Sequence, residues 1–356
     1  MHALPSNPPI YRLLGGPGSP YSLKMRAVLR YRRLPHLWIV PRGYLGKGGE
    51  LQRAGKGMIP VLQYPDGRYQ ADSTPLVHDL ETRHPGLRSV VPQDSGAAFL
   101  SHLIEDMADE LLVGALFDLR WGSATDQTFC ATRQLSGWLG PTPQSELNEH
   151  IRRFTLRQTA HREAMVGSEG GHQLLMSFYV ATLDAMESML EHTAYLFGDR
   201  PSLADFGLYG QLCQCALDPS ASAIMRSRAP RTFQWTQSLD DACGVEGDWA
   251  APTEWEAGVR RMLLLAGHYY LPYLLAHHLA VEAGADAFEV IIDGLRWRGR
   301  PERYKHKCLV WLQRRWADLT PQAQDSIRPL LQETGCLDNL AQPAESRLHV
   351  AEMALR

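Results

Sequence analysis

Three hydroxyl side chains gather at the start of a predicted helix, where Ser19, Tyr21 and Ser22 surround Pro20. A hydroxyl there can donate a hydrogen bond to an anion, and the helix N-terminus adds partial positive charge at the same place. Such a site suits a thiolate, because a free thiol with a pKa of about 8.5 is mostly protonated at neutral pH. The competing interpretation is that Ser19 only caps the helix, which is a common use of Ser-Pro.

Two further motifs have the chemistry to bind a peptide-like ligand. Met58, Ile59 and Pro60 open a predicted strand, and a cis bond at Pro60 would expose the Ile59 backbone for pairing. A trans proline at an edge strand is the common alternative. Asp72 and Ser73 open the next helix, where a carboxylate suits an ammonium group, and a hydroxyl with helix amides suits a carboxylate. A plain N-cap also explains either residue alone.

The elements that must position these motifs follow the order strand, helix, strand, irregular segment, hairpin, helix. The apolar patterns predict strands over 10–14, 36–40, 59–64 and 68–71, helices over 19–31 and 73–84, a Gly-rich segment over 42–57 and a turn over 65–67. The first helix is predicted to carry Lys24, Arg26 and Arg30 on its polar face. A βαβ unit followed by ββα is the order that a thioredoxin-like domain requires.

Three segments in this order, SPYSLKMRAVLRY (19–31), MIPVL (58–62) and ADSTPLVHDLE (71–81), resemble the N-terminal domain of glutathione transferases. In that family the first helix opens with a Ser, Cys or Tyr beside the glutathione sulfur. Ser19-Pro20 looks like the start of the serine- and cysteine-type members.

The resemblance implies a role for each motif. Ser19 would activate the thiol, with Tyr21 and Ser22 as the other possible donors. Ile59, before a cis-Pro60, would pair with the cysteinyl backbone of glutathione. Asp72 and Ser73 would hold the γ-glutamyl group. Where many members have a polar residue before the Val-Pro pair, this chain has Met58, and Lys56 is a weak substitute.

Beyond residue 96 the patterns are mostly helical. They predict helices over 97–119, 146–166, 172–196, 202–217, 254–283 and 301–318, an irregular segment over 121–143, and a possible hairpin over 288–299. Residues 195–212 resemble the family's helical domain and contain a capping box from Ser202 to Asp205. We therefore expect an α+β thioredoxin-like domain over 8–86 and an all-α domain over 97–356. This domain would be enlarged by an insertion near 120–165 and a C-terminal extension, as in a longer, mostly bacterial subgroup.

Composition narrows the class of partner. The chain has 356 residues, 44% of them hydrophobic, and a net charge of −3, so it offers no electrostatic footprint for nucleic acid or an anionic membrane. The apolar window 262–281 contains three histidines and a proline, which predicts a buried helix rather than a membrane span. Six cysteines without a disulfide or zinc spacing, and an N-terminus without a signal-peptide pattern, favour the cytoplasm.

Two clusters of possible metal ligands are expected to have other roles. Glu105, Asp106, Asp109 and Glu110 are predicted to form a solvated or capping face of a helix. The histidines and the cysteine at positions 277, 278, 306 and 308 match no known ligand spacing, and we expect them to make core hydrogen bonds. The sequence therefore predicts no metal site.

The leading hypothesis is a homodimeric, glutathione transferase-like enzyme with glutathione as co-substrate and a small, hydrophobic electrophile as the second substrate. One alternative is a binding or scaffold protein that keeps the fold without catalysis. The other is a dedicated lyase, isomerase or dehalogenase of one metabolite.

Overall fold

The computed structural model describes residues 10–41, 49–86 and 88–341. Parts of three predicted segments lie outside the described residues. These are residues 8–9 of the first predicted domain, residues 42–48 of the Gly-rich segment, and residues 342–356 at the end of the predicted helical domain.

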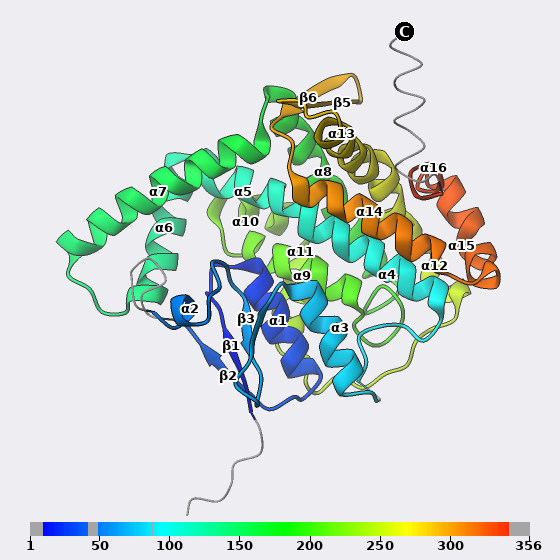
Figure 1. Cartoon of the computed structure of the whole chain (residues 1–356), viewed down its shortest axis with the longest axis horizontal. Coiled ribbons are helices and arrows are strands. Elements are labelled where there is room, and N and C mark those ends of the chain that lie inside the picture. The colour runs from blue at the N-terminus through cyan, green and yellow to red at the C-terminus, as the bar shows by residue number, and fades with distance from the viewer. Residues whose placement is uncertain (1–9, 42–48, 87, 342–356) are drawn as a thin grey trace, which may run out of the picture.

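The N-terminal part is a four-stranded sheet with helices packed on it (Figure 1). Its elements are β1 (Tyr11–Leu14), α1 (Pro20–Tyr31), β2 (His36–Ile39), α2 (Glu50–Arg53), β3 (Val61–Gln63), β4 (Tyr69–Ala71) and α3 (Ser73–Arg83). The strand order is β2-β1-β3-β4, with β1 parallel to β2 and β3 antiparallel to both of its neighbours. The predicted thioredoxin-like order of elements is confirmed.

The rest of the described chain is mostly helical. Its elements are α4 (Ser95–Met107), the π-helical turn η1 (Ala108–Leu112), α5 (Val113–Gly122), α6 (Ala124–Leu139), α7 (Gln144–Val166), α8 (Glu169–Met189), α9 (Leu203–Cys215), α10 (Pro219–Arg228), α11 (Pro230–Leu239), α12 (Pro252–Leu265), the π-helical turn η2 (Ala266–Tyr270), α13 (Leu271–Glu282), β5 (Phe288–Ile292), β6 (Leu295–Gly299), α14 (Arg303–Ala317), α15 (Pro321–Glu333) and α16 (Leu337–Leu340). An α/β domain followed by an enlarged helical part is therefore confirmed. The β5–β6 hairpin interrupts the helices, so the region is not strictly all-α.

The predicted irregular segment over 121–143 is wrong for most of its length, because residues 124–139 form α6. Ser123 caps this helix by accepting a hydrogen bond from the Asp126 amide, and Gly140 ends it with a φ of +70°. The glycine within it, Gly137, faces Pro17 closely and does not break the helix. Together α6 and α7 form a helical hairpin at the left of Figure 1.

Helix α9 is the centre of the core, since every residue from Leu203 to Cys215 is buried. Its start is the predicted capping box, in which Ser202 and Asp205 each bond the backbone amide of the other. Asp205 also accepts a hydrogen bond from the Leu196 amide at 3.0 Å. Helices α1 and α4 pack directly against α9, which ties the sheet domain to the helical region.

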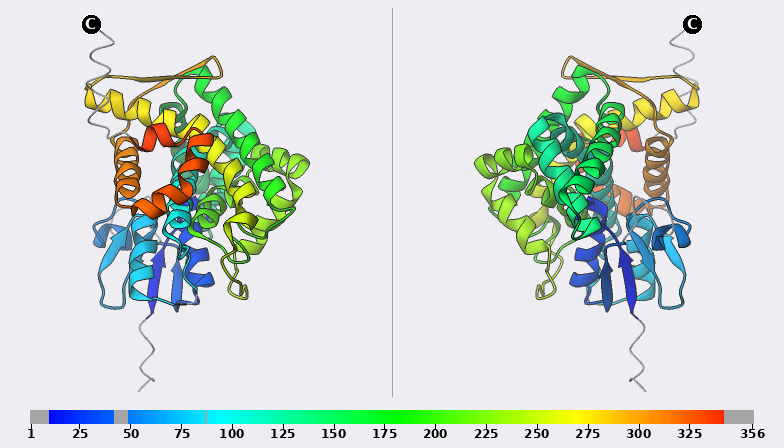
Figure 2. Two further views of the ribbon diagram at one scale, coloured as in Figure 1. Left: turned by 90° about the vertical axis from the view of Figure 1, so that its right-hand side faces the viewer. Right: turned by 90° about the vertical axis from the view of Figure 1, so that its left-hand side faces the viewer.

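The apolar window 262–281 spans the end of α12, η2 and most of α13, and many of its side chains are buried in the helical region. Figure 2 shows these helices above the N-terminal sheet, close to the β5–β6 hairpin. Within residues 10–341, apart from the two undescribed gaps, the helices fall short of the length and apolarity that a bilayer crossing demands.

Candidate functional site

The register of the sheet brings the three predicted motifs to one end. Leu14 pairs with Val61, and Val61 pairs with Ala71. The end of β1, the start of β3 and the end of β4 therefore lie side by side. The chain continues from these three points to the Ser19 turn, back to Ile59-Pro60, and on to Asp72. Segments far apart in the chain thus meet at one end of the sheet.

Ser19 stands at the N-cap of α1 with extended backbone angles, and Pro20 follows as the first helical residue. Its hydroxyl oxygen accepts a hydrogen bond from the Ser22 amide at 3.3 Å. The capping role is therefore real. A hydroxyl can accept one hydrogen bond and still donate its own proton to another group, so capping leaves Ser19 able to stabilise an anion.

The other two hydroxyls are less suited to that role. The Tyr21 hydroxyl donates to the backbone carbonyl of Asp109 at 2.7 Å, which commits its proton. Ser22 has no exposed surface at all. Ser19 is half-buried, and is the hydroxyl of the three that combines exposure with an uncommitted proton.

The turn that presents Ser19 is held by the helical region through a buried polar network. Arg120 of α5 donates to the Gly18 carbonyl at 2.9 Å, and Gln214 of α9 donates to the Pro17 carbonyl at 3.1 Å. The Arg120 guanidinium is buried and pairs with the buried carboxylate of Asp218. Sequence reasoning missed these residues, because their only signal was charge within apolar helical patterns.

Helix α6 packs against the same turn. A Cβ atom placed on Gly16 would lie 2.5 Å from the indole nitrogen of Trp138, and one on Gly18 would lie 2.3 Å from Gln134. A side chain at Gly16 would collide with the rigid indole of Trp138, whereas one at Gly18 would displace Gln134. Trp138 also belongs to an apolar cluster against which Ile59 packs, so the α6–α7 hairpin contacts two of the predicted site motifs.

The Ile59-Pro60 bond is cis, as the motif predicted. Because β3 begins at Val61, Ile59 lies just outside the paired part of the sheet. Met58 is 77% exposed, and Lys56 is half-buried on the adjoining turn. The segment before β3 therefore lies at the end of the sheet from which the Ser19 turn leaves β1.

Asp72 has a φ of +82°, which residues with a side chain rarely adopt, and such strain recurs at functional sites. Its carboxylate lies at the N-cap of α3 without a cap hydrogen bond of ordinary geometry, although the nearby Thr74 amide opposes the rise in its pKa that burial causes. Asp72 accepts a hydrogen bond from the hydroxyl of Tyr304, on α14, at 3.2 Å. Desolvation raises the pKa of Asp72, while the Tyr304 bond opposes that rise. Ser73 is buried at the first position of α3.

A buried ion cluster lies beside this corner and corrects two sequence predictions. Lys24 is fully buried instead of lying on a polar face, and its ammonium donates to Glu105 and, at 2.5 Å, to Asp109. Thr74 of α3 also donates to Glu105. Burial alone would lower the pKa of Lys24, but the carboxylates of Asp109 and Glu105 outweigh it and raise that pKa.

The other two acidic residues of α4 and η1 are also engaged. Asp106 accepts a hydrogen bond from Tyr270 at 2.7 Å, and Glu110 pairs with Lys305 of α14 at 2.5 Å. Burial, followed by repulsion from Glu110, raises the pKa of Asp106 well above its usual range. The expected solvated face is therefore wrong, because α1, η2 and α14 cover it with two lysine ammonium groups and the Tyr270 hydroxyl.

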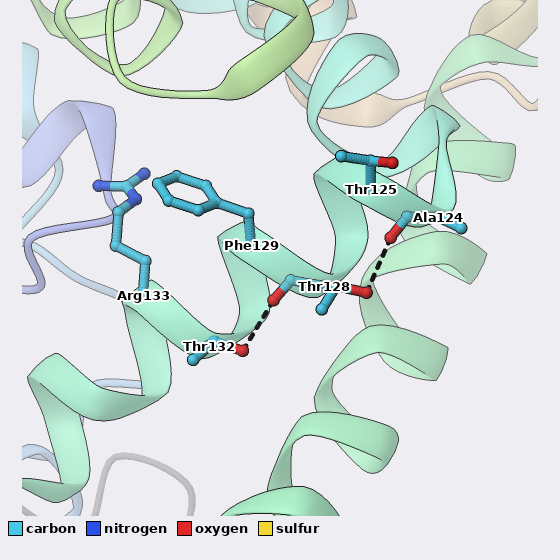
Figure 3. A pocket seen from close by; sticks show the side chains of 6 residues that line it. All are labelled: Ala124, Thr125, Thr128, Phe129, Thr132 and Arg133. Atoms are coloured by element: carbon cyan, nitrogen blue, oxygen red, sulfur yellow. Dashed lines mark hydrogen bonds between the residues drawn. The ribbon is translucent and has the colours of Figure 1, made fainter.

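One face of α6 borders an open hollow of about 710 Å³ (Figure 3). Its lining residues are Ala124, Thr125, Thr128, Phe129, Thr132 and Arg133. The hydroxyls of Thr128 and Thr132 turn back to carbonyls of their own helix, at 2.8 and 2.7 Å. The lining is consequently mostly apolar, with Arg133 and the Thr125 hydroxyl as its polar groups.

Comparison with known proteins agrees with this arrangement. The sequence profile described as Glutathione S-transferase, N-terminal domain, matches residues 13–88, and the one described as Glutathione S-transferase, C-terminal domain, matches residues 179–238. The chain has no significant sequence match among curated proteins.

Solved structures with a similar fold include several glutathione transferases. One, from Methylobacterium radiotolerans in complex with glutathione sulfonate, is 18% identical over 68% of this chain and 97% of its own, with a TM-score of 0.42. A beta-etherase from Sphingobium sp. strain SYK-6 is 18% identical over 69% of this chain and 98% of its own, with a TM-score of 0.47. The two profile matches fall on the sheet domain and on the helices around α9, and each of these parts resembles the corresponding domain of the glutathione transferase family.

Proposed function

We propose that the chain binds glutathione along the sheet end and activates its thiol for attack on a small, apolar electrophile. The observation that carries the proposal is the convergence of three motifs at that end: the Ser19 turn, the cis Ile59-Pro60 bond and the strained Asp72. Ser19 would face the sulfur, the Ile59 backbone would pair with the cysteinyl unit, and Asp72 with Ser73 would hold the γ-glutamyl group.

Ser19 would act by stabilising the thiolate. The thiol gives its proton to solvent, and the Ser19 hydroxyl then donates a hydrogen bond to the negative sulfur at the positive end of α1. In the next step the sulfur lone pair forms a bond to an electrophilic carbon. The displaced group leaves with the electron pair of the broken bond.

The hollow on α6 is the place we propose for the electrophile. Phe129, Arg133 and Gly137 lie one turn apart on one stripe of α6, and Gly137 faces Pro17, two residues before Ser19. This stripe of α6 therefore runs from the hollow to the turn that presents the Ser19 hydroxyl. The lining is largely apolar and its one cation, Arg133, already pairs with Asp218 at 2.9 Å, so the hollow suits a hydrophobic substrate.

A non-catalytic binding protein is the second candidate, and one contact favours it. Tyr304 already bonds Asp72, the residue proposed for the ligand ammonium, and Met58 offers no polar side chain to a ligand. Dedicated lyase, isomerase or dehalogenase chemistry would use the same thiolate on a particular metabolite. Homodimerisation and a cytoplasmic location stay predictions, and light scattering measures the first.

Calorimetry with glutathione and a chlorodinitrobenzene conjugation assay test the proposal on Ser19→Ala. Loss of the hydroxyl should lower kcat by about a hundredfold, the order of magnitude for losing one donor to a developing anion. Thr320→Ala is the matched control, because Thr320 caps α15 through a similar 3.2 Å bond to the Ala323 amide.

Both variants should lose about 1 kcal/mol of stability, and the control should keep full activity. Absence of glutathione binding at millimolar concentration would refute both the enzyme and the glutathione-binding alternatives. Binding without conjugation that leaves Ser19→Ala and wild type equal would favour the non-catalytic protein.

A further inference from the structure

Away from the proposed glutathione site, α13 and α14 bring together three side chains that can each offer a metal-ligand atom. His278 and Glu282 lie on α13, and His306 lies on α14. The ligand atoms of all three are within 4.8 Å of one another. The two Nδ1 atoms are 2.8 Å apart, and the His306 Nδ1 is 3.5 Å from a Glu282 carboxylate oxygen.

The placement of these residues follows from the helices. His278 and Glu282 are four residues apart and therefore share one face of α13, against which the first turn of α14 packs. His278 is buried, His306 is half-buried and Glu282 is exposed. The cluster consequently runs from the core to the surface, and a bound ion would have a side open to water.

We propose that His278, Glu282 and His306 bind a divalent transition-metal ion such as Zn²⁺, with water completing the coordination. Two imidazole nitrogens and one carboxylate are the donor set of three-ligand zinc sites that keep an open position. The two Nδ1 atoms face each other at 2.8 Å, so both rings would bind the ion through Nδ1 in the tautomer that carries its proton on Nε2.

The required movement is small. The two rings are parallel, with centroids 4.8 Å apart, and their Nδ1 atoms face each other at 2.8 Å. Metal–nitrogen bonds of about 2.0–2.1 Å in a tetrahedron separate the two nitrogens by roughly 3.3 Å, so the gap opens by about half an ångström. Side-chain rotation at half-buried His306 supplies such a change.

The position of His306 gives the site a structural consequence. Tyr304, two residues earlier on α14, bonds Asp72, and Lys305 bonds Glu110. An ion at the cluster would tie the first turn of α14 to α13, and so fix the turn that reaches the sheet domain. Metal binding itself requires no glutathione, so this inference stands or fails separately from the proposed function.

Titration of the chelator-treated full chain with ZnCl₂, followed by calorimetry, and with CoCl₂, followed by visible absorption, tests the site. We expect one ion per chain, a Kd at or below about 1 µM, and cobalt bands of low coordination number. His306→Gln should weaken binding by about a hundredfold and Glu282→Gln by about tenfold.

His268→Gln is the matched control, because His268 faces Asp293 at 3.0 Å on the surface and is not part of the cluster. It should bind Zn²⁺ like the wild type. Circular dichroism and a thermal melt show that each variant is folded. Absence of binding at 100 µM ZnCl₂, or wild-type affinity in folded His306→Gln, would overturn the proposal.

Discussion

Two parts of the helical region lie outside the residues matched by the family profiles, and each contacts one end of the proposed glutathione site. The α6–α7 hairpin (124–166) packs on the Ser19 turn and on Ile59, whereas α14 (303–317) contacts Asp72. In Figure 1 they lie on different sides of the molecule. The enlarged helical part is therefore built around both ends of the predicted glutathione site.

The two contacts differ in kind. At the sulfur end, close packing at Gly16 and Gly18 and the buried Arg120–Asp218 pair fix the backbone that presents Ser19. At the γ-glutamyl end, α14 adds a hydrogen bond between exposed side chains. Substitutions at the sulfur end should therefore lower the stability of the fold, whereas substitutions at the γ-glutamyl end should change the affinity for the ligand.

The largest expected effect is a loss of folding stability at the sulfur end. Asp218→Ala leaves the buried Arg120 guanidinium without its carboxylate partner, and should lower the free energy of unfolding by about 3–5 kcal/mol. Urea denaturation measures the change. Asp184→Ala is the control, because Asp184 pairs with Arg228 on the surface, where an ion pair contributes about 0–1 kcal/mol. Equal losses in both variants would contradict the contrast that we draw.

Protonation of His78 in acid should weaken the contact between α3 and α14. Burial, followed by the neighbouring Arg315 of α14, lowers the pKa of His78 to about 4. The unfolded chain therefore takes up the proton first, and the stability that neutral His78 confers is lost as pH falls from 6.5 toward 4. The slope is about 1.4 kcal/mol per pH unit for one proton.

Urea denaturation at several pH values, on wild type and His78→Asn, measures this effect. Over that pH interval, the free energy of unfolding of the variant should change by about 1.4 kcal/mol less per pH unit than that of the wild type. Parallel stability curves for the two proteins would show that α14 does not make this corner acid-sensitive.

The smallest expected effect concerns Tyr304. Its hydroxyl lowers the pKa of Asp72 and leaves the other carboxylate oxygen for a ligand ammonium. Tyr304→Phe should raise the KM for glutathione about threefold to tenfold at unchanged kcat, since one such bond contributes about 0.5–1.5 kcal/mol. Steady-state kinetics and calorimetry measure it. Tighter glutathione binding in the variant would identify Tyr304 as a competitor of the ligand.

The sequence predicted the sheet domain well, because its signals are local. Strand patterns, Ser-Pro, Ile59-Pro60 and the capping box at Ser202 are each contained in a few residues, and the structure shows the cis bond and the box. Their convergence depends on strand register, which the order of elements implies. The Asp72 backbone strain was not predictable from the motif.

The missed side-chain contacts share one physical cause, which is pairing across long stretches of chain. Lys24 meets Glu105 from 81 residues away, so each charge alone indicated a polar or solvated face, and Arg120 meets Asp218 from 98 residues away, a pair that no local pattern indicated. Tyr304 lies 232 residues from Asp72, and no local pattern connects them. Helix α6 was missed because its glycine and mixed polarity resemble a loop, while Gly137 serves close contact with Pro17.

The most direct test of the central claim is the pKa of the glutathione thiol when it is bound to the protein. Thiolate absorbance, recorded against pH on wild type and Ser19→Ala, gives this value. We predict a pKa at least about one unit below the free value of about 8.5 in the wild type, and a return toward the free value in the variant. An equal thiol pKa in the two proteins, with glutathione bound to both, would contradict the role of Ser19.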